Sequence, residues 1–342
     1  MTSIATAITP QGHQNTSSQD NIKQEFVAVN NMAFGEDHCK AVDPPLELSI
    51  TTSVITILLT IITLPGNLFI CVAMAKDPNK NLRTSFNYLL LNIAVSDLII
   101  GTVTDPLVVY FHIREGLGYK VSSFVVPHMS FFIGCTASLL SIAMLAIERS
   151  IAANSNFHRR LTKNRVTIMS MVIWVFSVAF PCMYFKIGYL KMSFVFSILM
   201  LVVTSVIVMT FIRIFSNIRR NKVAPQTSEV DDSTAKMRLK RTECERRVTS
   251  IFRAILIFYT ICSVPALIFI FIVNICSTCS CQLIHWSRDF IQLCVLINCC
   301  GNQFLYAWRM RCFTRAFKAL VKQRVTKQEG STAYFSNTAE RS

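Results

Sequence analysis

Residues 192–215 read MSFVFSILMLVVTSVIVMTFIRIF and contain a single charged residue, Arg213. A helix of about 20 apolar residues is long enough to cross the hydrocarbon core of a bilayer. Six other runs have a similar length and polarity, and His285, Arg288 and Asp289 make the last of them the weakest. The sequence therefore predicts transmembrane helices at 48–75, 86–111, 121–147, 166–184, 192–215, 252–276 and 283–308.

The composition agrees with a chain embedded in a membrane. Hydrophobic residues make up 52% of it and charged residues 15%, whereas about 25% of a typical soluble domain is charged. Barrel strands would be shorter and would alternate in polarity, while a helix satisfies its own amides in hydrocarbon. We predict an all-α membrane protein, a seven-transmembrane helix bundle with a short amphipathic eighth helix. The chain has no nucleotide-binding loop, HExxH motif or Ser-His-Asp grouping that would favour an enzyme.

The basic residues predict the orientation. With the N-terminus outside, most of the 34 Lys and Arg residues lie on the inner side, as the positive-inside rule requires. Residues 1–47 are polar and do not begin with a basic-then-apolar signal sequence, so the first helix should act as the insertion signal. We expect a multi-pass plasma-membrane protein with an extracellular N-terminus and a glycosylation acceptor at Asn15.

Changes in composition divide the chain into four parts: an extracellular segment (1–47), a seven-helix domain (48–308), an interfacial helix (309–321) and a cytoplasmic tail (322–342). The domain includes a basic cytoplasmic loop, 219–247. The interfacial helix is predicted because apolar and basic side chains would lie on different faces, with Met310, Phe313, Phe317, Leu320 and Val321 opposite Arg311, Arg315, Lys318 and Lys322. A basic, solvated tail is the alternative.

Polar residues inside the helices are informative, because an ionisable group in hydrocarbon is costly and is usually functional. They comprise Asn67 after Gly66, Asp97 in LNIAVSDL, Glu148-Arg149-Ser150, Trp174, Asn298 and the run Asn302-Gln303-Phe304-Leu305-Tyr306. In this order and spacing, the chain resembles a rhodopsin-like (class A) G-protein-coupled receptor over residues 48–321. The resemblance implies a receptor that transduces an extracellular ligand signal to heterotrimeric G proteins.

The resemblance also implies partners: a G protein, arrestin bound through the Ser/Thr-bearing tail, an extracellular small ligand or peptide, and membrane lipid, but no nucleic acid. The family's activation motifs correspond here to Cys262, Pro265, Asn302 and Tyr306. Departures from the motifs leave open a non-signalling decoy or scaffold. Ser150 replaces a tyrosine, Gln303 a proline, and Ser263 the aromatic switch of the sixth helix.

A polar cluster is expected near the middle of the bilayer. Helical rise places Ser138 about 16 Å from Arg149, at a depth similar to that of Asp97. A lone carboxylate there must be protonated, paired or bound to a metal, and hard cations prefer oxygen ligands. In the family, the constellation Asp97, Ser138, Asn298 and Asn302 resembles an allosteric sodium site. A water-bridged hydrogen-bond network without a cation is the alternative.

A resting lock is expected at the cytoplasmic end, where Arg149 follows Glu148. Glu245 precedes Pro265 by about 30 Å of helix, which puts it at the inner mouth of the bundle. By resemblance to the family, an ion pair between Arg149 and Glu245 would hold the third and sixth helices together. Two solvated charges contributing less than about 1 kcal/mol are the alternative.

The cysteines separate this chain from most class A receptors. Phe124 stands where the family has the cysteine that ties the third helix to the second outer loop, and that loop is short, 185–191. Disulfides are expected instead among Cys39, Cys276, Cys279 and Cys281 on the oxidising side. These features resemble the melanocortin, adenosine, cannabinoid and lysophospholipid receptor cluster. By that resemblance the favoured pairs are Cys39 with Cys279 and Cys276 with Cys281.

The residues at the positions where related receptors contact their ligands narrow the choice of ligand class. Phe131 stands where amine receptors have an aspartate, and Leu296 where visual pigments have a Schiff-base lysine. Melanocortin receptors bind a peptide and calcium through acidic residues, and none of those acids is present here. Asp105 could partly substitute for them. A peptide, lipid or nucleoside-like ligand is therefore favoured over an amine. The expected pocket residues are Asp105, His128, Phe131, Phe132, Cys135 and Gln292.

Overall fold

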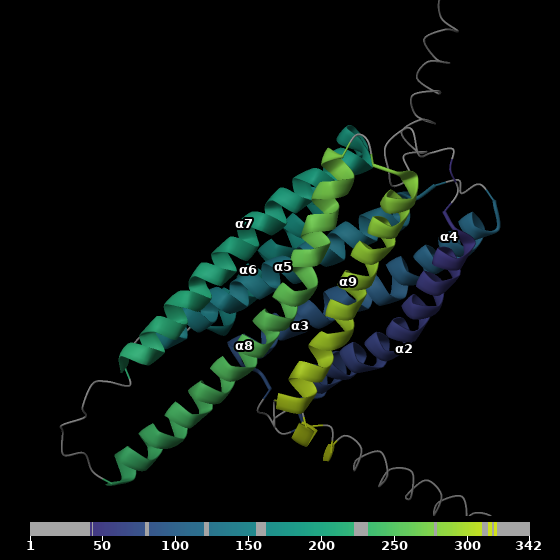
Figure 1. Ribbon diagram of the computed structural model, residues 1–342. Helices are drawn as coiled ribbons and strands as arrows, with labels where there is room; N and C mark the ends of the chain where they lie inside the picture. The colour runs from purple at the N-terminus through teal and green to yellow at the C-terminus, as the bar shows by residue number, and fades with distance from the viewer. Residues whose placement is uncertain are drawn as a thin grey trace, which may run out of the picture.

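The computed structural model is a single bundle of long helices (Figure 1). It describes residues 42, 44–78, 82–119, 123–154, 162–221, 232–276, 279–309, 314–316 and 318–319, without the side chains of 152–154, 190, 215, 217–221, 232–248 and 306–309. The elements are α2 (Leu46–Lys76), α3 (Ser85–Ile99), the π-helical turn η2 (Ile100–Thr104), α4 (Asp105–Gly116), α5 (Val125–Asn154), α6 (Lys163–Ala179), the 3-10 turn η3 (Phe180–Met183), α7 (Tyr184–Asn221), α8 (Asp232–Ile275) and α9 (Cys281–Arg309).

These elements confirm the predicted seven-helix, all-α fold, because α3, η2 and α4 form one span, Ser85–Gly116, and α6 continues through η3. Within the described part of the chain, six spans are long and apolar enough to cross a membrane. The remaining helix is α9, which carries Arg288 and Asp289 near its start. Of the predicted interfacial helix, 314–316 and 318–319 are helical, and the rest of it after Arg309 lies outside the described residues.

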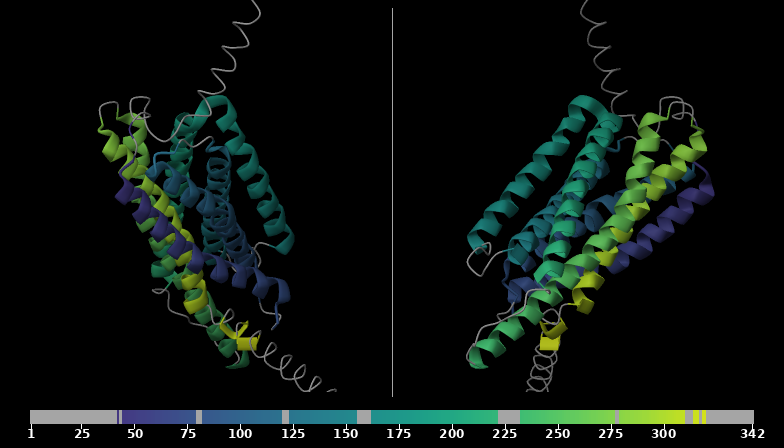
Figure 2. Two further views of the ribbon diagram at one scale, coloured as in Figure 1. Left: turned by 90° about the vertical axis from the view of Figure 1, so that its right-hand side faces the viewer. Right: turned by 60° about the vertical axis from the view of Figure 1, so that its left-hand side comes forward.

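The inner and outer faces of the helices differ as a bilayer requires. The largest fully buried side chains include Phe132, Leu90 and Phe252, which lie between helices. Large apolar side chains on the periphery stay exposed, such as Val175, 70% exposed, on α6, which stands at the edge of the bundle in the left view of Figure 2. Exposed apolar side chains on the outside and buried ones within are the arrangement of a helix bundle surrounded by lipid.

The connection between α6 and α7 is even shorter than predicted. The segment 185–191 is helical on both sides of Gly188, where the backbone takes φ 77° and ψ 175° and reverses the chain. A positive φ favours glycine, which has no Cβ. Almost no chain is therefore left at this point to cover the bundle.

Candidate functional site

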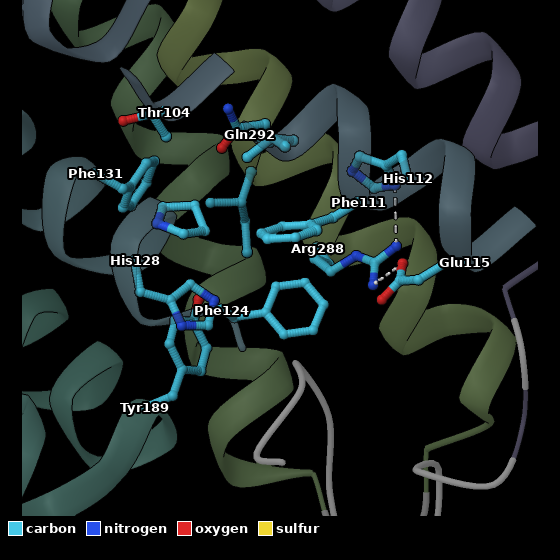
Figure 3. Close-up of a pocket in the computed structure, with 13 residues that line it drawn as sticks. Thr104, Phe111, His112, Glu115, Phe124, His128, Phe131, Tyr189, Arg288 and Gln292 are labelled. Atoms are coloured by element: carbon cyan, nitrogen blue, oxygen red, sulfur yellow. Dashed lines mark hydrogen bonds and ion pairs between the residues drawn. The ribbon is translucent and has the colours of Figure 1, made fainter. Parts of the chain in front are cut away.

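A cavity opens at the end of the bundle that the sequence predicts to be extracellular. Helices α4, α5, α7 and α9 supply its walls, which are mostly apolar and aromatic (Figure 3). The lining side chains include Phe111, His112, Glu115, Phe124, His128, Phe131, Tyr189, Arg288, Ile291 and Gln292. We call this the upper cavity. A concave apolar site with a few convergent polar groups is the usual form of a small-ligand site.

A chain of aromatic rings ties one wall of the upper cavity together. The rings of Phe111 and Phe124 have centroids 4.8 Å apart, Phe124 stacks on His128 at 5.7 Å, and His128 lies 4.1 Å from Tyr189. The chain thus joins α4, the start of α5 and α7. Aromatic pairs at such distances contribute about 0.5–1.5 kcal/mol beyond their burial. Phe124, at the position of the family's disulfide cysteine, links helices through ring contacts.

The opposite wall is an ionic cluster around Arg288. Its guanidinium lies 3.0 Å from Glu115 and donates a 2.9 Å hydrogen bond to Asp289. Arg288 also lies 3.3 Å from Nδ1 of His112, while Asp289 accepts a 2.9 Å hydrogen bond from Thr52. All of these groups are buried or nearly so, and buried charges persist only when they are paired. The cluster therefore joins α2, α4 and α9 at the mouth of the cavity.

A second cavity lies directly beneath the first. Phe131 and Ile291 line both of them. The lower cavity is lined by aromatic and aliphatic side chains together with smaller ones such as Cys135, Cys262, Ser263, Ala266 and Cys294, and Ser138 and Asn298 are among its polar residues. Ser263, at the position of the family's aromatic switch, leaves this space unfilled.

Of the predicted pocket residues, His128, Phe131 and Gln292 line the upper cavity and Cys135 the lower one. Asp105 and Phe132 line neither, which corrects two expectations. The Asp105 carboxylate accepts a 2.8 Å hydrogen bond from Thr60 of α2. Phe132 is 1% exposed and packs against Tyr189 and Phe196.

The phase of the helix explains the error at Asp105. The π-helical turn Ile100–Thr104 adds a residue to the helical turn, and this rotates everything after it. The face that reaches the cavity then comprises Thr104, Val108, Phe111, His112 and Glu115, which follow the i, i+4, i+7, i+8, i+11 pattern of one helical face. Asp105, next to Thr104, is turned away toward α2.

Sequence reasoning missed the ionic cluster. Arg288 and Asp289 make the last predicted transmembrane helix the weakest, while His112 and Glu115 lie just beyond the predicted end of the second one at residue 111. A signal was nevertheless present: two adjacent charges inside an otherwise apolar helix must find partners, and His112 and Glu115 lie three apart on one helical face.

Comparisons with known proteins agree with this architecture. The crystal structure of squid rhodopsin superimposes with a TM-score of 0.71 at 16% identity, covering 85% of this chain and 90% of that one. The chain has the rhodopsin fold. Residues 66–193 match the family model described as 7 transmembrane receptor (rhodopsin family). The predicted resemblance to rhodopsin-like class A receptors is thereby confirmed.

Two relatives match the chain over part of its length. The D(2) dopamine receptor A of Xenopus laevis is 32% identical over 146 residues, which are 42% of this chain and 32% of that receptor. Neuromedin-U receptor 2 of Mus musculus is 33% identical over 138 residues, 39% of this chain and 34% of that receptor. The chain thus matches about a third of the length of these relatives. They are receptors and not enzymes, and neither belongs to the predicted melanocortin-like cluster.

Within the rhodopsin fold, the mid-membrane polar cluster is partly assembled. Asp97 is fully buried, and one of its oxygens accepts a 3.1 Å hydrogen bond from Asn302. Its Oδ1 has no hydrogen-bond partner among the described residues. Ser138 and Asn298 line the lower cavity. A buried carboxylate oxygen without a donor is a group that a cation or water would satisfy.

At the inner end of α5, Glu148 and Arg149 pair with each other and are both buried. The guanidinium of Arg149 also lies 4.9 Å from the ring centroid of Phe86 on α3, a cation–π distance. Glu245 belongs to α8, but its side chain lies outside the described residues, as does that of Tyr306. The predicted lock between Arg149 and Glu245 stays a prediction.

The outer cysteines pair differently from the expectation. Cys276 is bonded to Cys279, with Cα atoms 5.7 Å apart, which corrects both favoured pairs. Cys279 follows the end of α8 closely enough to reach Cys276, and this proximity decides the bond. Cys281 is also in a disulfide. Cys39 and Asn15 lie outside the described residues.

Proposed function

We propose that this chain is a plasma-membrane receptor that couples an extracellular ligand to a heterotrimeric G protein through outward movement of α8. The observation that carries the proposal is the position of two sites at opposite ends of one bundle. The upper cavity lies at the predicted outer end, and the buried Glu148–Arg149 pair lies at the inner end of α5. The rhodopsin-family match of residues 66–193 supports the same conclusion.

Movement of α8 has a physical basis in this chain. Pro265 lies inside α8, and an internal proline removes a backbone hydrogen bond and kinks a helix. Pro265 stands between Ser263 and Ala266, which line the lower cavity. A ligand that changes the packing there would change the angle of α8 and so the space beside Arg149.

A sodium ion at Asp97 is part of the proposal. Asp97, Ser138, Asn298 and Asn302 offer oxygen atoms of the kind that hard cations prefer, and Asp97 Oδ1 has no hydrogen-bond partner among the described residues. A bound cation would neutralise Asp97 and favour one arrangement of the helices around it. The ion can shift the equilibrium only if it binds the two states with different affinity.

Arrestin is proposed to bind the Ser/Thr-bearing tail, 322–342, and lipid to contact the exposed apolar faces. The finer placement in the melanocortin, adenosine, cannabinoid and lysophospholipid cluster is also proposed. It is supported by Phe124 in place of the disulfide cysteine and by the turn at Gly188 in place of an outer loop.

Nucleotide exchange tests the function. The full chain, expressed in membranes with each class of heterotrimeric G protein, is expected to accelerate exchange either alone or with one member of a ligand library. The Arg149→Ala variant at equal surface level is the control. A parent that stays indistinguishable from this variant throughout, while binding a ligand, would favour the decoy or scaffold for which Ser150, Ser263 and Gln303 leave room.

A further inference from the structure

Glu148 and Phe86 contact different surfaces of the Arg149 guanidinium. The Nε and Nη2 atoms of Arg149 donate hydrogen bonds to the two carboxylate oxygens of Glu148. Its Cζ atom lies over the ring of Phe86, 4.9 Å from the centroid. A guanidinium is planar and carries its N–H donors on its edge. A carboxylate bound at the edge therefore leaves the face for an aromatic ring.

The ring of Phe86 is a fixed support for this contact. Phe86 is the second residue of α3, and the chain around it is tied by hydrogen bonds. Thr84 accepts a 3.2 Å bond from the backbone N–H of Asn87, and the Asn87 amide donates a 2.8 Å bond to the carbonyl oxygen of Leu82. The ring is 4% exposed and belongs to the same buried core as Leu82. It cannot follow Arg149 when the arginine moves.

The ring adds an attraction that the carboxylate does not supply. Glu148 neutralises the charge of Arg149, and both side chains are buried, where an unpaired charge would be costly. The face of an aromatic ring attracts a cation electrostatically, and the attraction is strongest where water is excluded. An aliphatic side chain at position 86 would fill the space without this attraction. The residue type at this position therefore sets how firmly Arg149 is held.

The contact with Phe86 holds Arg149 at α3. The helix that carries Arg149, α5, contacts both α3 and α8. Coupling as proposed above uses the guanidinium in the space that opens when α8 moves outward. A contact shifts an equilibrium only if it differs between the two states, and this one is lost when Arg149 leaves the ring. It does not depend on Glu245, since neither Phe86 nor Glu148 belongs to α8.

We propose that Phe86 is a positioning residue for G-protein coupling. Its ring holds the guanidinium of Arg149 beside Glu148 in the resting state, and Arg149 must leave the ring before it reaches a G protein. The inference rests on the proposed receptor function, because it assigns the regulation of the same site.

Stepwise fluorination of the ring tests the proposal. Mono-, di- and trifluorinated phenylalanine, incorporated at position 86 of the full-length protein, nearly keep the shape of the ring and weaken the negative potential of its face in steps. Basal nucleotide exchange on a G protein, at equal surface level, should rise with each fluorine and reach at least about threefold in the trifluorinated protein. Phe86→Leu, which removes the ring, should raise exchange at least as far.

The matched control is the same fluorinated series at Phe132. This ring is also buried in the core, and it packs against Tyr189 and Phe196. Fluorination there should leave basal exchange unchanged, because the series alters a ring of the same kind away from Arg149.

A stability measurement tests the contact without any signalling. The unfolding midpoint in phosphatidylcholine nanodiscs should fall with each fluorine at Phe86 while Glu148 and Arg149 are present. In a background with Glu148→Gln and Arg149→Gln, which has neither charge, the same series should leave the midpoint nearly unchanged. The difference between the two backgrounds separates cation–π attraction from packing.

Two results would overturn the proposal. One is a parent that signals but whose basal exchange responds to fluorination at Phe86 no more than at Phe132. The other is an equal fall of the midpoint with and without the charged pair, which would make Phe86 a packing residue only. If the midpoint depends on the charged pair but no G protein responds to the parent or to any variant, the proposed receptor function is wrong. The first result, in a signalling parent, contradicts this inference alone.

Discussion

The side-chain amide of Gln303 in α9 donates a 2.8 Å hydrogen bond to the backbone carbonyl oxygen of Ile62 in α2. Gly66, one helical turn after Ile62, makes the approach possible. A Cβ atom on Gly66 would lie 1.4 Å from Oε1 of Gln303, well inside any real contact. The residue that replaces the family's proline thus becomes a direct link between the first and last helices of the bundle.

The first prediction follows from this close approach. Gly66→Ala should lower the stability of the purified protein by about 1–3 kcal/mol, the usual cost of an overpacked contact. Gln303→Ala alone should cost about 1 kcal/mol, the typical value of a hydrogen bond. The measurement is the thermal unfolding midpoint in nanodiscs.

The double variant Gly66→Ala with Gln303→Ala is the control for the first prediction. Removing the amide makes room for the new methyl group, so the double variant should be no less stable than Gln303→Ala alone. Simple addition of the two losses would show that Gly66 is needed for some other reason.

The sequence predicts the helices but neither the ionic cluster nor the direction of Asp105, and the difference has a physical reason. The helices follow from the length of apolar sequence that a bilayer demands, and this requirement is local in the chain. The ionic cluster is different, because Glu115 and Arg288 are far apart in sequence and meet only when α4 packs beside α9. Asp105 was misplaced because a π-helical turn changes the phase without a clear mark in the residues. Helical periodicity predicts the face on which a side chain lies only as long as the helix is regular.

The second prediction concerns the ionic cluster. Arg288→Met removes the shared partner of the buried Asp289 and the partly buried Glu115, and an uncompensated buried charge costs about 3–5 kcal/mol. We expect a marked loss of protein at the cell surface, measured by labelling of an N-terminal tag. Arg165→Met, at an exposed arginine of α6, should have no such effect.

A variant in which the whole cluster is neutral tests whether the unpaired charge causes the loss of surface protein. Adding Glu115→Gln and Asp289→Asn to Arg288→Met makes the cluster neutral and should restore part of the surface level. If the triple variant is worse than Arg288→Met, shape and hydrogen bonds rather than charge hold this end of the bundle together.

The third prediction concerns the inner end. Glu245→Ala should raise basal nucleotide exchange, because it would release α8 from Arg149, and Arg149→Ala should abolish exchange. Glu47→Ala, at an exposed glutamate near the outer end of α2, is the matched control. Parent-like exchange by both Glu245→Ala and Arg149→Ala, at equal surface level, would rule out coupling by this route.

The fourth prediction concerns sodium. Raising sodium at constant ionic strength, with N-methylglucamine as the replacement cation, should lower basal exchange, because the ion favours the resting state. Asp97→Asn removes the charge and keeps the shape, so exchange by this variant should not depend on sodium. A parent without any sodium dependence would leave Asp97 with its hydrogen bond from Asn302 as its role.

The fifth prediction concerns the outer disulfides. Peptide mapping under non-reducing conditions should recover Cys276 linked to Cys279, and Cys281 linked to another cysteine, for which Cys39 is the expected partner on the same side.

The first bond closes a segment of three residues and contributes little, because loop-closure entropy grows with loop length. A bond from Cys39 to Cys281 would close a loop of hundreds of residues and contribute about 2–5 kcal/mol. Cys281→Ser should therefore lower the unfolding midpoint more than Cys276→Ser does. Free thiols at all four positions, or a bond between Cys135 and Cys182, would contradict this outer architecture and remove the support that the cysteines give to the proposed sub-family.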